Sequence, residues 1–151
     1  IPFVYAFIGG SVFGNDSDAA YEDEVKRLAK DKDLFNKRVF FVGERDDVAN
    51  IMREADLLII PSENESFGVV AIEALAAGLP IVSTPNDGVV EILENDKRFI
   101  AASRDPQDLF YLAQNLLSDD ELRRRVGQEM LVLSSKFKVE NTSNAFVEAI
   151  K

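Results

Sequence analysis

Short apolar runs alternate with longer amphipathic segments over the first two thirds of the chain. The apolar runs are rich in β-branched and aromatic side chains, as is typical of buried strands. They occupy residues 3–8, 39–42, 57–60 and 81–83, with a less regular run at 99–101. Strands that alternate with helices in this way form a parallel sheet covered on both faces. The pattern therefore predicts an α/β fold, Rossmann-like, with three α/β/α layers and a helical C-terminal third.

Helices are predicted at residues 19–30, 47–54 and 67–77, with a short turn of helix at 89–93. The third of these must end near Gly78, which suits a left-handed cap, because Pro80 cannot continue a helix. Asp105 followed by Pro106 indicates a capped helix start, and residues 118–121 match a capping box that begins at Ser118. From residue 105 onward we expect only helices, the last at about 140–150.

The composition restricts the possible functions. With 151 residues, 46% of them hydrophobic, the chain fits one domain over residues 1–151. A net charge of −10 opposes nucleic-acid binding and strong membrane contact. The absence of cysteine and histidine excludes disulfides, thiolate and histidine catalysis, and most transition-metal sites. No apolar run reaches the length of a membrane span and no signal peptide is evident, so we expect a cytoplasmic protein.

A candidate anion site follows the apolar run at 57–60. In an open α/β sheet, ligands bind beyond the carboxyl ends of the strands, where helix N-termini present free amides. Ser66 is the expected N-cap of the helix at 67–77. The first amides, which lack partners within the helix, belong to Phe67, Gly68, Val69 and Val70. Glycine at position 68 costs about 1 kcal/mol in a helix, and we interpret it as leaving room for a phosphate.

Two glutamates frame this helix start. Glu73 is the one carboxylate in an apolar run from Val69 to Ala77, and a charge there needs water, a cation or hydrogen-bond donors. Its carboxylate can accept two hydrogen bonds from a ribose hydroxyl pair. Glu65, before the helix, can reach hydroxyls beyond the phosphates. Taken alone, each glutamate would more often be simple solvated surface charge.

These residues resemble a known family. The run from Glu65 to Glu73 matches the Glu-x7-Glu signature of retaining GT-B glycosyltransferases of the family-4 type (glycosyl transferases group 1). Residues 61–62, 73–82 and 87–91 also match, and residues 3–10 and 39–43 resemble the first strands of the family's C-terminal, nucleotide-sugar-binding domain. The chain is thus similar to one half of a GT-B fold.

The resemblance implies a role for each part of the site. Glu73 would hold the donor ribose, the amides near 68–70 the diphosphate, and Glu65 the donor sugar or the transition-state charge. The loop of Gly43, Glu44 and Arg45 would border the base, and the glycine turn at Gly9 and Gly10 belongs to the expected donor site. The donor would be a nucleoside diphosphate sugar, with UDP the commonest base, and no essential metal or other cofactor is expected.

Some family features do not appear in this sequence. Family-4 enzymes commonly have an Arg and a Lys for the diphosphate upstream of the first strand, and an N-terminal acceptor-binding domain, which we expect as a partner. The chain alone should therefore be inactive, as an excised domain or half of a split enzyme. The alternative is a noncatalytic nucleotide-sugar-binding or assembly module that supports a partner chain. The base, sugar, acceptor and oligomeric state stay open.

Other motifs have simpler interpretations. Residues 11–14 do not complete a G-x-G-x-x-G motif after Gly9 and Gly10, which disfavours NAD. The acidic stretch at 16–24 is interpreted as a solvated helix entry, and Asp46 and Asp47 as an N-cap region, not a metal site. The three arginines at 123–125 are interpreted as a solvated helix face. A flavodoxin-like or receiver domain with a chance motif is the third hypothesis, although residues 8–10 lack a receiver's acidic pair.

Overall fold

A computed structural model of the chain describes residues 3–10, 16–65 and 67–138. The chain divides into two compact units, Ile1–Val48 and Ala49–Lys151, and each is described by itself. The final helix predicted at 140–150 lies outside the described residues.

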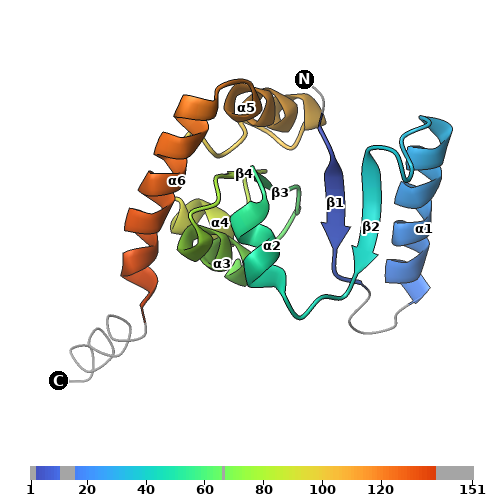
Figure 1. Cartoon of the computed structure of the whole chain (residues 1–151), viewed down its shortest axis with the longest axis horizontal. Coiled ribbons are helices and arrows are strands. Elements are labelled where there is room, and N and C mark those ends of the chain that lie inside the picture. The colour runs from blue at the N-terminus through green and yellow to red at the C-terminus, as the bar shows by residue number, and fades with distance from the viewer. Residues whose placement is uncertain (1–2, 11–15, 66, 139–151) are drawn as a thin grey trace. The chain divides into compact units, whose positions relative to one another are not determined.

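The first unit is a parallel pair of strands with one helix. In chain order its elements are β1 (Tyr5–Ile8), α1 (Asp16–Asp31) and β2 (Val39–Gly43). Figure 1 shows the two strands side by side with α1 next to β2. Phe7 lies opposite Phe41 in the register, and their rings stack with centroids 4.6 Å apart. The register then slips so that Ile8 pairs with Gly43, where the chain turns with a φ of 75°.

The second unit contains the remaining elements. They are α2 (Val48–Glu54, whose first residue belongs to the first unit), β3 (Leu58–Ile60), α3 (Val69–Ala77), β4 (Ile81–Ser83), α4 (Asp87–Ile92), α5 (Pro106–Ser118), α6 (Asp120–Ser134) and the 3₁₀ turn η1 (Ser135–Phe137). β3 and β4 pair in parallel, and every residue of β4 is buried. The predicted strand at 99–101 forms only an isolated parallel bridge, between Ile100 and Ser83. Parallel strands separated by helices confirm the predicted α/β class.

Helix α3 is packed tightly because its inner face consists of small and apolar side chains. Ala71, Ala74 and Leu75 are completely buried. At its end, Gly78 adopts the predicted left-handed cap with a φ of 71°. Helix α6 passes so close that a Cβ on Gly127 would lie 2.6 Å from the Gly78 carbonyl oxygen. Only glycine at position 127 allows this contact.

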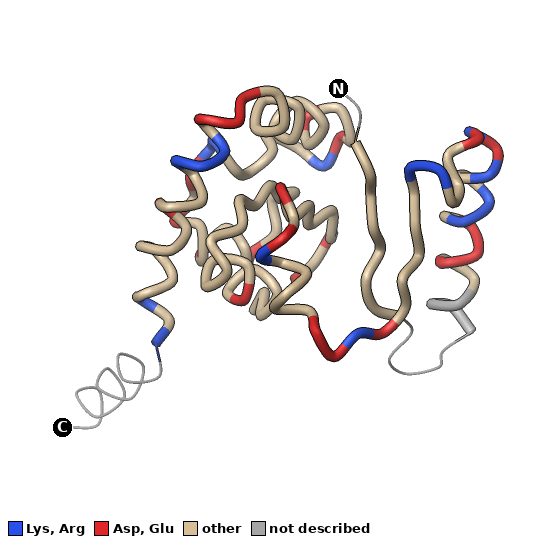
Figure 2. The backbone as a smooth tube through the Cα atoms, viewed as in Figure 1, with Lys and Arg blue, Asp and Glu red and all other residues tan. Residues whose placement is uncertain are grey.

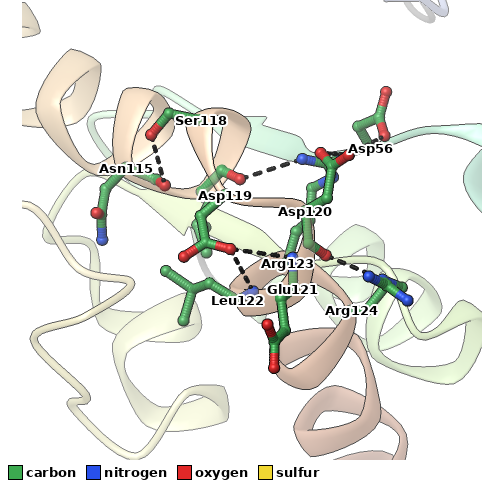
Figure 3. A network of polar contacts seen from close by, with 10 residues as sticks. Asp56, Asn115, Ser118, Asp119, Asp120, Glu121, Leu122, Arg123 and Arg124 are labelled. Atoms are coloured by element: carbon green, nitrogen blue, oxygen red, sulfur yellow. Dashed lines mark hydrogen bonds and ion pairs between the residues drawn. The ribbon is translucent and has the colours of Figure 1, made fainter.

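The junction between α5 and α6 corrects one predicted cap. Asp105 caps α5 as expected, accepting a hydrogen bond from the Gln107 amide at 2.8 Å. For α6 the cap is Asp119, not Ser118, since Asp119 Oδ1 accepts from the amides of Glu121 and Leu122 (Figure 3). The Ser118 hydroxyl instead donates to the carbonyl of Asn115 within α5. Because the Ser118 hydroxyl bonds within α5, the next residue, Asp119, caps α6.

The three arginines at the start of α6 do not form a uniformly solvated face. The Arg123 side chain is only 19% exposed, and its Nη2 pairs with Asp56 at 3.1 Å and with Asp120 at 2.8 Å (Figure 3). Arg124 and Arg125 are exposed, as predicted. Arg123 therefore ties α6 to the segment that leads into β3.

Candidate functional site

The candidate site lies where β3 ends and α3 begins. The loop that joins them starts at the carboxyl end of β3, and residues 62–65 are polar or acidic throughout. The helix begins at Val69, and its N-cap is Gly68, with φ 78° and ψ 44° and no side-chain cap. The predicted N-cap, Ser66, lies outside the described residues, and the assignment of the cap to it is wrong. A positive φ at the cap is a conformation that glycine adopts without strain.

Position 68 requires glycine because of its positive φ and because little space is left for a side chain. It is buried, and a Cβ there would lie 3.1 Å from Ile92 Cδ1 and 3.3 Å from Val89 Cγ2. The room that glycine leaves is therefore filled by α4, which corrects the interpretation that it was left for a phosphate. What the site offers an anion is backbone: the amides of Val69 and Val70 are the first two of the helix and have no carbonyl partner within it.

Glu65 is held by two hydrogen bonds, one from its side chain to the start of α3 and one from its backbone to α4. Its Oε1 accepts a hydrogen bond from the Gly68 amide at 3.3 Å, and its backbone carbonyl accepts one from the Gly88 amide at 3.0 Å. A carboxylate near a helix N-terminus is stabilised by the helix dipole. Glu65 is half-buried, and its carboxylate lies at the start of α3.

Glu73 lies one turn into α3 on the exposed side. Its side chain reaches water, so the argument that an apolar helix must give this charge a special partner does not apply. Val69, four residues earlier and hence on the same face, is 57% exposed, and Phe67 is 62% exposed. The exposed face at the start of α3 thus carries apolar side chains and one carboxylate. Glu73 lies about 6 Å along the helix axis from the first helical residue, Val69.

Polar groups that the sequence did not single out hold this region from below. Ser83, the last residue of β4, and Thr84 and Asn86 just after the strand are all buried. Thr84 Oγ1 donates to the carbonyl of Ser62 at 2.5 Å, and Asn86 caps α4 by accepting from the Val89 amide at 3.1 Å. Their sequence signal is a hydroxyl or amide side chain directly after an apolar strand.

The remaining predicted site residues belong to the first unit. Gly9, with a φ of 112°, donates its amide to the Gly43 carbonyl at 2.9 Å, which links the two glycine turns. Gly9 and Gly10 also line a hollow of about 340 Å³ with Phe7 and Tyr21. The role of these glycines in donor binding stays a prediction.

The loop after β2 is charged and paired within itself. Arg45 donates two hydrogen bonds to Asp47, at 2.8 and 2.7 Å, and this pairing lowers the pKa of Asp47 and raises that of Arg45. Figure 2 shows the alternating acidic and basic residues between β2 and α2. The carboxylate of Asp47, just before α2, is thus paired with Arg45. The roles of Glu44 and Arg45 at a base stay predictions.

Two features that the described residues lack bear on the chemistry. Over residues 3–10, 16–65 and 67–138, no three His, Cys, Asp or Glu side chains are grouped so that they could hold a metal ion. In the same part of the chain, no helix combines the length and hydrophobicity needed to cross a bilayer.

The arrangement of the elements identifies the class of protein. This is the α/β fold of the C-terminal domain of GT-B glycosyltransferases. HepE from Anabaena, solved in complex with UDP, has a similar structure, with a TM-score of 0.84 and 24% identity. The match covers 99% of this chain and 41% of the HepE chain. The chain belongs to the family of glycosyl transferases group 1, whose model matches residues 2–130. The family match contradicts the hypothesis of a receiver or flavodoxin-like domain.

Two curated relatives show the extent of the similarity. The N-acetyl-alpha-D-glucosaminyl L-malate synthase of Bacillus anthracis is 37% identical over 92 residues, 60% of this chain and 24% of the relative. A D-inositol 3-phosphate glycosyltransferase of Corynebacterium kroppenstedtii is 33% identical over 135 residues, 85% of this chain and 30% of the relative. The chain thus spans about a quarter to a third of the length of these proteins.

Proposed function

We propose that this chain is the donor-binding domain of a glycosyltransferase that moves a sugar from a nucleoside diphosphate sugar to an acceptor hydroxyl, with retention at the anomeric carbon. The observation behind this proposal is the start of α3, where the amides that have no partner within the helix, Glu65 and the exposed Glu73 lie within one or two helical turns. Membership of the family, and the fold shared with HepE, which was solved in complex with UDP, support it.

In this proposal the diphosphate binds at the amides of Val69 and Val70. These amides lie at the positive end of the α3 dipole, which favours anions. During transfer the bond between the anomeric carbon and the diphosphate oxygen breaks, and the nucleoside diphosphate leaves with the electron pair. The negative charge that develops on the leaving oxygen is greatest in the transition state, so fixed amides at this position lower the barrier.

The two glutamates have different tasks in this proposal. Glu73 accepts hydrogen bonds from the ribose hydroxyls, a role consistent with its exposure on the same face as Val69. Glu65, held at the helix start, accepts from hydroxyls of the donor sugar or stabilises the positive charge of the transition state. We further propose that no metal is required, since the helix amides compensate for the diphosphate charge, and that an N-terminal domain supplies the acceptor site.

A nucleotide screen tests the binding half of this proposal. The chain is titrated calorimetrically with UDP, GDP and ADP and with their glucose conjugates, in buffer with EDTA, up to millimolar concentrations. We expect selective binding of one base without metal. Failure of every nucleotide to bind at these concentrations would contradict the proposal. Binding without sugar transfer by the full-length protein would favour the noncatalytic module instead.

A further inference from the structure

The loop between β3 and α3 is hydrogen-bonded to three other segments of the second unit. Three of its carbonyls accept hydrogen bonds: Ser62 from Thr84 Oγ1 at 2.5 Å, Glu63 from Arg104 Nη2 at 2.9 Å, and Glu65 from the Gly88 amide at 3.0 Å. Of these donors, Thr84 follows β4, Gly88 lies at the start of α4 and Arg104 precedes α5. A short acidic loop is thereby fixed along its length, although Glu63 and Glu65 repel each other.

Gly88 contacts this loop more closely than any other residue type allows. A Cβ at position 88 would lie 2.7 Å from the Glu65 carbonyl oxygen and 3.0 Å from both the backbone nitrogen and the carbonyl carbon of Phe67. Position 88 is buried, and its φ is not in the left-handed region, so glycine is required there by space alone. Any larger residue must displace the backbone on both sides of position 66.

Arg104 contacts the same loop from the segment before α5. Its own backbone is held by its neighbours: Ser103 Oγ donates to Asp108 at 2.6 Å, and Asp105 caps the helix. The guanidinium donates to a loop carbonyl 41 positions away in the sequence and brings a positive charge to an acidic loop. Arg104 is exposed, so removing its side chain leaves no buried cavity.

We propose that Gly88 and Arg104 are positioning residues that set where Glu65 stands relative to a donor sugar bound at the start of α3. This inference rests on the proposed function, and neither residue touches the donor in it. Gly88 fixes the backbone of Glu65 by contact and by a hydrogen bond. Arg104 fixes the preceding peptide and offsets the repulsion between Glu63 and Glu65.

The test compares how much the sugar adds to nucleotide affinity. The wild-type chain, Gly88→Ala, Arg104→Ala and Arg104→Lys are each titrated with UDP and UDP-glucose, or with the corresponding pair for the base that binds. We expect both alanine variants to lose about two- to tenfold in the affinity ratio of conjugate to free nucleotide, the size of one lost hydrogen bond. Affinity for the free nucleotide, which lacks the sugar that Glu65 contacts, should stay within about twofold. Arg104→Lys should retain most of the ratio.

Two controls separate positioning from damage to the fold. Gly127→Ala introduces the same methyl group against another backbone carbonyl, at 2.6 Å, but at the opposite end of α3. Lys97→Ala removes an exposed cation that contacts Asn95, away from the loop. Both should leave the affinity ratio unchanged. If Gly88→Ala does not fold, the Arg104 pair decides the question.

The outcomes distinguish this inference from the proposed function. If no nucleotide binds the wild-type chain, the proposed function fails and this inference with it. If nucleotides bind but the sugar adds nothing in the wild type, or its contribution survives in both alanine variants, the positioning role is wrong and nucleotide binding stands. Equal loss of free and conjugated nucleotide would also contradict positioning of Glu65.

Discussion

The carboxylate of Glu65 accepts a hydrogen bond from the amide of Gly68, the N-cap of α3, at 3.3 Å. In this arrangement an acidic side chain of the protein occupies the positive end of the helix. A diphosphate at the neighbouring amides would lie beside that carboxylate and be repelled by it. In the proposed function, the Glu65 side chain turns from Gly68 to the donor sugar when the nucleotide binds, while its backbone carbonyl stays bonded to Gly88.

This relationship predicts an unusual effect of Glu65→Gln. Without the charge, free UDP, or whichever nucleoside diphosphate binds, should bind about two- to fivefold more tightly, the size of one removed surface charge interaction. Sugar transfer by the full-length protein should fall sharply, because the carboxylate is lost from the sugar. Calorimetry at low and high salt measures the first effect, which should shrink as salt screens it.

Glu63→Gln is the matched control, since it removes the same charge from an exposed position in the same loop. It should change nucleotide affinity less and leave transfer intact. Equal effects of the two variants would mean that only the overall charge of the loop matters.

The close approach of Gly127 to Gly78 predicts that Gly127→Ala lowers stability, whereas Gly→Ala in a free helix raises it. In a free helix, Gly→Ala stabilises by about 1 kcal/mol. At position 127 the new methyl group would meet the Gly78 carbonyl at 2.6 Å, so Gly127→Ala should lower the free energy of unfolding by about 1–3 kcal/mol. Urea unfolding measures this, with the exposed neighbour Gln128→Ala as the control, expected within about 0.5 kcal/mol of wild type. A stabilised Gly127→Ala variant would show that α6 does not approach α3 so closely.

The two N-caps of α4 and α5 should differ in their contribution to stability. Asn86 is 3% exposed, and its amide also donates to Ser83 Oγ at 3.0 Å and to the Thr84 carbonyl at 3.1 Å. Asn86→Ala should cost about 2–3 kcal/mol, because it takes the cap from the buried Val89 amide and one hydrogen bond each from the Ser83 hydroxyl and the Thr84 carbonyl. Asp105→Ala removes an exposed cap and should cost about 1 kcal/mol. Denaturant unfolding of both variants checks the order; equal losses would contradict the buried network.

The turn after α4 predicts a pH dependence. Arg98 donates to Asp96 through its guanidinium, at 2.7 Å for the shortest contact, and this lowers the pKa of the Asp96 carboxyl. A depressed folded pKa contributes stability above the unfolded value, near 3.9, and that stability is lost as the pH falls through the folded value. Asp96→Asn should therefore destabilise the protein modestly at neutral pH, and the difference from wild type should vanish in strong acid. A difference that stays constant with pH would exclude this ion pair as its cause.

Much of the fold followed from local patterns, because the strands and helices of this chain are punctuated by residues with strong preferences. β4 begins and ends where the apolar run does, and Gly78 ends α3 as its position before Pro80 predicts. At 99–101 an apolar run became a single bridge, since strand formation depends on neighbours that the sequence does not show.

The candidate site stays a prediction, and its internal contacts could not be predicted from the sequence. Glu65 and Glu73 are candidates because they lie in one continuous signature. Gly68 was misinterpreted because the side chains that fill its space, Val89 and Ile92, belong to another helix. Arg104 was missed for the same reason, since it contacts Glu63 across 41 positions of sequence.

The most direct test of the donor-binding proposal is calorimetric titration of wild type, Glu73→Ala and Glu54→Ala with the nucleotide that the screen selects. Glu54 is an exposed glutamate at the end of α2 and controls for the loss of one negative charge. Glu73→Ala should weaken binding by about 1–3 kcal/mol, from lost hydrogen bonds to the ribose, with its thermal stability unchanged. Glu54→Ala should bind like wild type. Wild-type affinity in Glu73→Ala would contradict the proposed placement of the donor along α3.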